Sequence, residues 1–221
     1  CALPISNPKL LSPTPMTEPI IFTGGLAATN AYLIDLRGHL LAIDAPEGFL
    51  DFLKKKKIKP DSLLLTHGHW DHMQGAAEVV QATGAVCHAH VADRLLLENP
   101  RVMSDFMAED LNLAPVAVTD WIRPGKPLAA LGLEAEVRHV PGHCPGSVLF
   151  YFAAAGVAFV GDALFNGGVG RTDLPGGDYA ELERSIRTQI YTLPDDTVVY
   201  PGHGPATTVG DEKSLNPFVR G

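Results

Sequence analysis

Four side chains that can bind a metal ion lie within six residues of one another. The stretch LLLTHGHWDHM (63–73) contains His67, His69, Asp71 and His72. Imidazole nitrogens together with a carboxylate oxygen suit Zn²⁺ or another divalent first-row metal better than Ca²⁺. Without a metal, several polar groups would be desolvated at the edge of an apolar core, which costs free energy. We therefore interpret the stretch as a metal site rather than as solvated loop residues.

The spacing of these side chains indicates how they are placed. On a helix, His67 and His69 would point about 200° apart. We therefore expect the pair in a loop that follows a buried strand formed by LLLT (63–66). From that loop, Asp71 and His72 can face a different direction, so one set of side chains is available to one metal and the other set to a second.

Three further candidate ligands follow apolar segments and stand beside glycine or proline. His143 follows EVRHVPG, Asp162 follows VAFVG and His203 follows VVYPG. Functional side chains of sheet proteins gather in loops at strand ends, so we expect these three to join the first four. The complete candidate set is His67, His69, Asp71, His72, His143, Asp162 and His203.

The elements that must position these loops are short and alternate along the chain. Apolar runs bounded by glycine, proline and asparagine predict strands, and apolar residues at helical spacing predict helices. We expect strands at 19–22, 31–36, 40–44, 63–66, 85–90, 132–140, 148–152 and 157–162 and within 197–205, with His203 just beyond the last. We expect helices at 49–60, 73–83, 91–100, 103–113 and 178–193, the last opened by Asp178 and Glu181 in a capping-box-like pattern.

Composition excludes several classes of function. The chain has 221 residues, of which 46% are hydrophobic and 19% charged, as in an ordinary soluble domain. A net charge of −8 argues against nucleic-acid binding, and no apolar run is long enough to span a membrane. Three cysteines form neither a disulfide framework nor a cysteine-based zinc site. A reducing, cytoplasmic location is therefore expected.

The N-terminal segment differs from the rest. Its first fifteen residues contain four prolines and no apolar periodicity. We interpret residues 1–18 as a disordered or non-native leader, with Met16 as the natural start, and residues 19–221 as a single domain. The alternative is that Cys1 marks a processed lipoprotein.

The motifs resemble those of metallo-β-lactamase-fold hydrolases. The matching residues are H-x-H-x-D-H at 67–72, His143, Asp162 and His203. The resemblance implies an α+β fold, a four-layer αββα sandwich with two metals at one edge. It also implies that His67, His69 and His143 hold one metal. Asp71, His72 and His203 would hold the other, with Asp162 bridging the two ions, and the expected metals are two Zn²⁺, with Fe or Mn as alternatives.

A closer resemblance is to short bacterial glyoxalase II-like hydroxyacylglutathione hydrolases. It rests on GDALF (161–165), GRTDLPGGD (170–178) and PGHGPATTVGDEKSLNPF (201–218). This implies that a hydroxide held between the metals attacks a thioester such as S-lactoylglutathione, with Asp71 and Asp162 as the catalytic carboxylates. The leaving thiolate needs no acid, because its conjugate acid has a pKa of about 8.5. Two departures are the lack of the C-terminal extension that holds glutathione, and Cys144 where the family usually has Thr.

Other functions compete with this one. A persulfide dioxygenase-like enzyme with one iron shares the GRTD motif and most of the ligands. Lactonases, arylsulfatase-like enzymes and nucleases share the ligand set, so a lactonase or esterase, or a weak β-lactamase, is a further alternative, although true β-lactamases usually carry Cys or Ser at the position of Asp162. A non-enzymatic scaffold is disfavoured because the seven ligands are intact. The expected partner is a small-molecule thioester, and a glutathione thioester is one candidate. The sequence does not indicate an oligomeric state. We expect Asp44 to orient a ligand histidine or to form a turn, Arg171 to brace the glycine-rich loop, and His88 and His90 to be structural.

Overall fold

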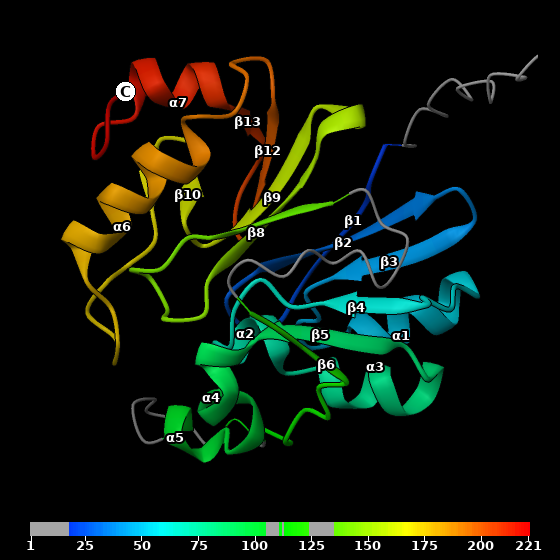
Figure 1. Ribbon diagram of the computed structural model, residues 1–221. Coiled ribbons are helices and arrows are strands. Elements are labelled where there is room, and N and C mark those ends of the chain that lie inside the picture. Colours follow the sequence, from blue (N-terminus) through cyan, green and yellow to red (C-terminus); the bar gives the residue numbers. More distant parts are fainter. Residues whose placement is uncertain (1–17, 105–110, 112, 124–134) are drawn as a thin grey trace, which may run out of the picture.

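The computed structural model describes residues 18–104, 111, 113–123 and 135–221 (Figure 1). The predicted leader lies outside this range except for its last residue, as do most of the helix predicted at 103–113 and the start of the strand predicted at 132–140. None of the helices in these described ranges has the length and apolar character needed to cross a bilayer.

The first sheet is built from the N-terminal half of the chain. Its strands follow one another in sequence order, antiparallel from β1 to β3 and parallel from β3 to β6. Its outer face carries helices α1 (Phe49–Lys56) and α3 (Ala76–Thr83), which make the crossovers that parallel neighbours require. The strands are β1 (Ile20–Gly24), β2 (Thr29–Leu36), β3 (His39–Ile43), β4 (Ser62–Leu64), β5 (Val86–His90) and β6 (Asp120–Ile122).

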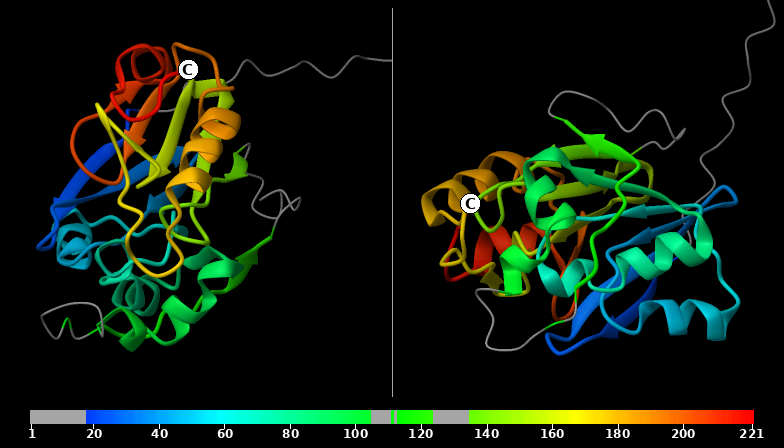
Figure 2. Two further views of the ribbon diagram at one scale, coloured as in Figure 1. Left: turned by 90° about the vertical axis from the view of Figure 1, so that its left-hand side faces the viewer. Right: turned by 90° about the horizontal axis from the view of Figure 1, so that it is seen from below.

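The second sheet comes from the C-terminal half, in the order β13-β12-β9-β8-β7. Its outer face is covered by α6 (Tyr179–Ser185), the π-helical turn Ile186–Ile190 that continues it, and α7 (Val209–Leu215) (Figure 2). The strands are β7 (Glu136–His139), β8 (Val148–Phe152), β9 (Val157–Gly161), β12 (Val198–Pro201) and β13 (Thr207–Thr208), and a separate hairpin joins β10 (Leu164–Phe165) to β11 (Gly168–Val169).

Three apolar cores separate four layers. Alternate side chains of a strand point to opposite faces, so neighbouring residues of β2 enter different cores. Leu33 packs with Phe49 and Leu53 of α1, whereas Ile34 faces the second sheet and packs in the same cluster as Phe150. A third core joins the second sheet to α6 through residues such as Leu182. The arrangement is the predicted four-layer αββα sandwich.

Several predicted elements are shorter than expected. The helix predicted at 73–83 begins later, as α3 from Ala76, and Met73 instead ends a separate short helix, α2 (Trp70–Met73), before the turn at Gly75. The Gly75 amide donates to the Ala45 carbonyl, and a Cβ on Gly75 would lie 2.7 Å from the Pro46 oxygen. The chain therefore bends there because this glycine packs directly on another backbone segment.

Other boundaries moved for local reasons. The helix predicted at 49–60 ends at Lys56, because Lys57 adopts a left-handed conformation. The segment 91–100 splits into the 3₁₀ turn Val91–Asp93 and α4 (Arg94–Glu98), followed by α5 (Arg101–Ser104). The predicted helix start at Asp178 is correct, because its side chain accepts a hydrogen bond from the Glu181 amide. The short elements β6, β10, β11, β13 and α7 were not predicted.

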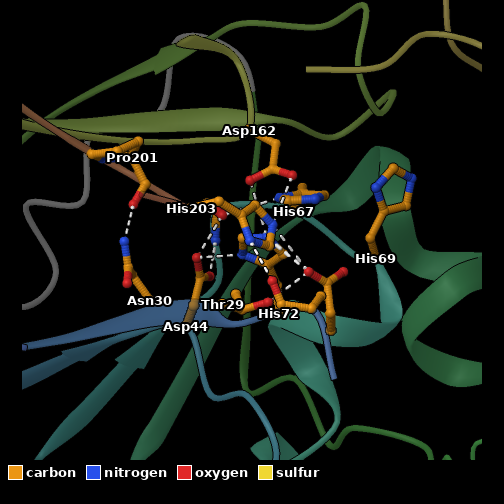
Figure 3. Close-up of polar contacts among 12 residues, drawn as sticks. Thr29, Asn30, Asp44, His67, His69, His72, Asp162, Pro201 and His203 are labelled. Atoms are coloured by element: carbon orange, nitrogen blue, oxygen red, sulfur yellow. Dashed lines mark hydrogen bonds and ion pairs between the residues drawn. The ribbon is translucent and has the colours of Figure 1, made fainter. Parts of the chain in front are cut away.

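The loops that carry the candidate ligands share one edge of the sandwich. β4 leads through residues 65–69 into α2, the β7–β8 connection carries His143, and Asp162 and His203 follow β9 and β12. Both sheets thus direct side chains to the same place, which is where the candidate site lies (Figure 3).

Candidate metal centre

The structure brings all seven predicted side chains together. Among the described residues there are three groups of metal-binding side chains, and within each group the donor atoms lie within 4.8 Å of one another. One consists of His67, His69 and His143, here called the first cluster, and another of Asp71, His72 and His203, here called the second cluster. The third joins His67, His72 and Asp162 and so connects the two.

The first cluster is assembled from two loops. His69 Nδ1 lies 2.8 Å from His143 Nε2, which lies 3.3 Å from His67 Nε2. Burial is the main cause that lowers the pKa of all three side chains, and together with the neighbouring His143 it lowers that of His69 to about 3. The three imidazoles are therefore neutral at pH 7, which is the form that binds a metal.

Backbone contacts fix the orientation of His143. Its Nδ1 donates to the Arg171 carbonyl at 2.7 Å, which leaves Nε2 as an acceptor facing the cluster. A Cβ on Gly170 would lie 2.0 Å from the Asp162 carbonyl oxygen and 2.8 Å from His143 Nδ1. The GRTD motif therefore supplies a glycine for this close approach. Its arginine makes a bidentate ion pair with Asp173, with both distances 2.7 Å, as expected for a bracing role.

The second cluster lies on α2 and on the turn after β12. His203 Nε2 and His72 Nε2 lie 3.2 and 3.5 Å from Asp71 Oδ2. Their other ring nitrogens are occupied, since His203 Nδ1 donates to the Ala27 carbonyl and His72 Nδ1 to Asp44. Both Nε2 atoms are thereby directed into the cluster, and Asp71 accepts a further hydrogen bond from Thr29 Oγ1 at 2.7 Å.

Asp162 reaches both clusters. Its Oδ1 lies 3.1 Å from His72 Nε2, and its Oδ2 lies 3.3 Å from His203 Nε2 and 3.6 Å from His143 Nε2. Figure 3 shows Asp162 facing the imidazoles of His67, His72 and His203. The two oxygens of this carboxylate therefore approach histidines of both clusters.

The charges of Asp71 and Asp162 are balanced by those of His72 and His203. Burial raises the pKa of both carboxyls, but His72 and His203 outweigh it, bringing the pKa of Asp71 to about 2 and holding that of Asp162 well below its usual range. Conversely, burial lowers the pKa of His203, but hydrogen bonds to Asp162 and Asp71 raise it to about 10. Burial also lowers the pKa of His72, but the negative charges of Asp162, Asp71 and Asp44, with Asp162 contributing most, raise it well above its usual value. Two anions thus face two cations.

These residues fit a pair of divalent metal ions. His72 Nε2 and Asp162 Oδ1 are buried and have no hydrogen-bond partner among the described residues, although they lie 3.1 Å apart. Buried polar atoms without a partner cost free energy unless an ion or water completes them. A Cβ on Gly202 would lie 2.0 Å from Asp162 Oδ1, so the glycine keeps this side open. The mixed nitrogen and oxygen donors are those that divalent first-row metals prefer.

Some supporting residues were not predicted. Thr29 and Asn30 open β2 and contact the ligand-bearing segments, and Asp93 contacts two ligand loops. His88 and His90, expected to be structural, belong to none of the ligand groups found in the described residues. His88 Nδ1 lies 3.5 Å from Asp120 Oδ2, and the His90 ring stacks on that of His139 at 4.3 Å.

Comparison with known proteins places this site in a family. The model of the metallo-β-lactamase superfamily matches residues 24–203. The chain belongs to this superfamily, and it is a metallo-hydrolase of it. It is 37% identical over 193 residues to the hydroxyacylglutathione hydrolase GloC of Haemophilus influenzae, covering 86% of this chain and 87% of that protein. It is 34% identical over 200 residues to the probable metallo-hydrolase YqgX of Bacillus subtilis, covering 89% and 95%.

Solved structures agree with this assignment. The crystal structure of the BLEG-1 B3 metallo-β-lactamase is 33% identical, with a TM-score of 0.81 over 92% of this chain and all of that one. That of TTHA1623 in a di-iron-bound form is 34% identical, with a TM-score of 0.81 over 90% of this chain and all of that one. ETHE1 from Myxococcus xanthus, at 24% identity and a TM-score of 0.72, shares the fold. The predicted family and fold are confirmed.

Proposed function

We propose that this protein is a two-metal hydrolase that cleaves thioesters of the hydroxyacylglutathione type. The observation that carries the proposal is the position of Asp162, which approaches His143 of the first cluster and His72 and His203 of the second. A carboxylate that reaches two ligand sets is the arrangement expected where two ions share one oxygen ligand.

We assign one metal to the first cluster, the other to the second, and the bridging role to Asp162. Zn²⁺ suits both sets, and Fe or Mn suits them as well, in line with the di-iron form of a similar protein. Bound divalent ions lower the pKa of water to about 7 and polarise a carbonyl group.

The carboxylates limit which leaving group the site can release. Asp71 and Asp162 are ionised at neutral pH, because the pKa of Asp71 is about 2 and that of Asp162 is held well below its usual range. They can accept hydrogen bonds from a nucleophilic water and orient it, but neither holds a proton to donate. A thiolate departs without protonation, since its conjugate acid has a pKa of about 8.5. An amide nitrogen needs a proton, so a thioester is the better substrate.

The similarity to GloC supports a glutathione thioester in particular. We propose a 2-hydroxyacyl thioester such as S-lactoylglutathione as the substrate and residues 19–221 as the catalytic domain. We also propose a cytoplasmic location, which is supported by the two buried free thiols of Cys87 and Cys144.

The test is metal quantification combined with a substrate panel. Purified protein is loaded with Zn²⁺, Fe²⁺ or Mn²⁺ and assayed with S-lactoylglutathione, other acyl thioesters, a lactone and nitrocefin. We expect two ions per chain and the highest kcat/KM for a thioester. Asp162→Ala is expected to lose activity while its circular dichroism spectrum stays unchanged, which separates an enzyme from a scaffold.

The second candidate is β-lactam hydrolysis, favoured by the 33% identity to a B3 metallo-β-lactamase. If nitrocefin or the lactone were turned over with higher kcat/KM than every thioester, the proposed substrate class would be wrong. A single iron per chain with oxygen uptake on glutathione persulfide would instead favour the dioxygenase alternative.

A further inference from the structure

We propose that Asp93 is a positioning residue that sets the separation between the two loops of the first cluster. This inference rests on the proposed metal site and adds a residue that neither touches the donor atoms nor belongs to the ligand motifs. Asp93 ends the 3₁₀ turn Val91–Asp93 that follows β5, and its side chain is 1% exposed.

The Asp93 carboxylate connects both ligand loops directly. Its Oδ2 accepts a hydrogen bond from the Gly68 amide at 2.8 Å, and Gly68 lies between His67 and His69. Its Oδ1 accepts from the Gly146 amide at 2.6 Å and from the Cys144 thiol at 3.1 Å. One buried side chain therefore links two backbone segments that are 78 positions apart, from 68 to 146.

Glycines on both sides allow this close contact. A Cβ on Gly68 would lie 3.0 Å from the Asp93 Cβ, and a Cβ on Gly146 would lie 2.4 Å from its Cγ. The distance of 2.4 Å at Gly146 is shorter than a Cβ atom can tolerate, so an alanine there would displace Asp93. The two glycines and the aspartate are therefore matched to one another, which a solitary surface hydrogen bond would not require.

The donor atoms that this link controls lie close together. His69 and His67 approach the His143 Nε2 at 2.8 and 3.3 Å, one loop facing the other. A shift of either loop changes these distances directly, because Gly68 is adjacent to His67 and His69, and Gly146 lies three residues after His143. When hydrogen bonds that hold metal ligands in place are removed, the affinity of the site for its metal typically falls about 10–100-fold.

The second cluster is held by other residues. Thr29 Oγ1 donates to Asp71, and Asp44 accepts from His72. The hydrogen bonds of the Asp93 side chain go to the loops at 68 and 144–146. Loss of Asp93 should therefore weaken the first cluster selectively, whereas a general loss of stability would weaken both.

The informative change is Asp93→Asn, which keeps the shape but turns one acceptor into a donor. That amide group then faces the amide N–H of Gly68 or Gly146, so one loop loses its bond. The variant is made in the full chain, in a His203→Ala background that retains the first cluster and in a His69→Ala background that retains the second. Zn²⁺ affinity is measured by competition with a chromogenic chelator, and the Co²⁺ absorption spectrum reports ligand geometry.

We expect Asp93→Asn to weaken Zn²⁺ binding at least tenfold in the His203→Ala background, with a changed Co²⁺ spectrum. In the His69→Ala background we expect less than a twofold change. Glu212→Gln is the matched control. Glu212 is another buried carboxylate, 3% exposed, and it accepts from Gly167, Thr207 and Asn216 rather than from the ligand loops. It should leave Zn²⁺ affinity unchanged even if the protein becomes less stable.

The outcomes separate this inference from the proposed function. Wild-type protein that binds no Zn²⁺ or Co²⁺ contradicts both. Wild-type binding with equal affinity in Asp93→Asn, or equal losses at both clusters, overturns only the role of Asp93. If Asp93→Asn does not fold, Cys144→Ala removes one of the three hydrogen bonds and should give a smaller loss at the first cluster. Cys144→Ser retains a donor and should restore the affinity, and an unchanged affinity in Cys144→Ala would overturn the role.

Discussion

His72 Nδ1 donates a hydrogen bond to Asp44 Oδ2 across 2.8 Å, and both side chains are buried. The same carboxylate accepts from the amide and the hydroxyl of Thr66, each at 2.8 Å. The Thr66 hydroxyl, having donated to Asp44, accepts from His67 Nδ1 at 3.1 Å. Asp44 thus determines which nitrogen of His72 faces Asp162 and, through Thr66, which nitrogen of His67 faces the first cluster.

Asp44→Asn tests this arrangement. Asp44 has φ 58°, a left-handed conformation that asparagine also tolerates, so the backbone should not change. The amide places a donor where Thr66 or His72 also donates. We expect metal affinity to fall about 10–100-fold and the free energy of unfolding to fall by about 1–3 kcal/mol, measured by chelator competition and urea denaturation. Asp61→Asn, an exposed acceptor for the Leu40 amide, is the control and should leave metal affinity unchanged.

Asn30 connects the first sheet to the turn that carries His203. Its side-chain Nδ2 donates to the carbonyls of Pro201 and Gly204 at 3.2 and 2.9 Å. Its backbone amide donates to the Gly202 carbonyl at 2.7 Å. Asn30→Ala removes the side-chain donor to the Gly204 carbonyl and leaves the Pro201 carbonyl with the Tyr32 hydroxyl, so we expect a loss of about 1–3 kcal/mol in the free energy of unfolding. We also expect weaker binding of the metal held by His203.

The control for Asn30 is Tyr32→Phe. The Tyr32 hydroxyl donates to the Pro201 carbonyl at 2.6 Å, and Asn30 still serves that carbonyl when the hydroxyl is removed. We expect a loss of about 1 kcal/mol in stability and unchanged metal stoichiometry. Equal metal loss in both variants, measured by elemental analysis after dialysis, would show that the Asn30 contacts do not act on His203 specifically.

The candidate ligands could be predicted because their signals are local. His143, Asp162 and His203 each follow an apolar run and stand beside a glycine, and the other four candidates lie within six residues of one another after the run at 63–66. Strand 148–152 was predicted with the bounds that the structure shows. The supporting residues gave no such signal. Asp93 fell within a predicted helix, and its role depends on Gly68 and Gly146, which lie 25 and 53 positions away.

Short elements were missed for a related reason. α7 buries Val209 and Glu212, too few positions to give an apolar helical repeat, although Thr208 caps it by accepting from the Asp211 amide. β13 has two residues and pairs only with β12, so no alternation can appear in it. Tertiary contacts, rather than local preference, define these elements.

Gly202→Ala tests whether space beside Asp162 is required. The added Cβ would lie 2.0 Å from Asp162 Oδ1 and 2.5 Å from His72 Cε1, so one of these ligands must move. Misplacement of a reacting group by about 1 Å can cost about 100-fold in rate, and we expect at least this loss of kcat. Gly204→Ala is the matched control. Gly204 has φ +74° but no atom within 4 Å of the added Cβ, so strain of about 1–2 kcal/mol is expected without loss of metal.

The metal affinities of the two clusters should depend on pH to different extents. The pKa of His69 is about 3, and those of His67 and His143 are also lowered, chiefly by burial, so the first cluster carries no proton to displace between pH 7 and 8. His203 has a pKa of about 10 and that of His72 is raised well above its usual value, so both hold protons in the metal-free protein over this range. A metal that binds the second cluster must displace both protons.

Zn²⁺ affinity of the second cluster should therefore rise as pH increases, because lower pH favours the protonated state that competes with the metal. With two protons released, we expect about a 100-fold gain in affinity at the second cluster from pH 7 to pH 8, and little change at the first cluster. Titration calorimetry in two buffers of different ionisation enthalpy counts the released protons, and His203→Ala should reduce the count by one. Binding of both ions without proton release at pH 7 would contradict the charge arrangement assigned to His72 and His203.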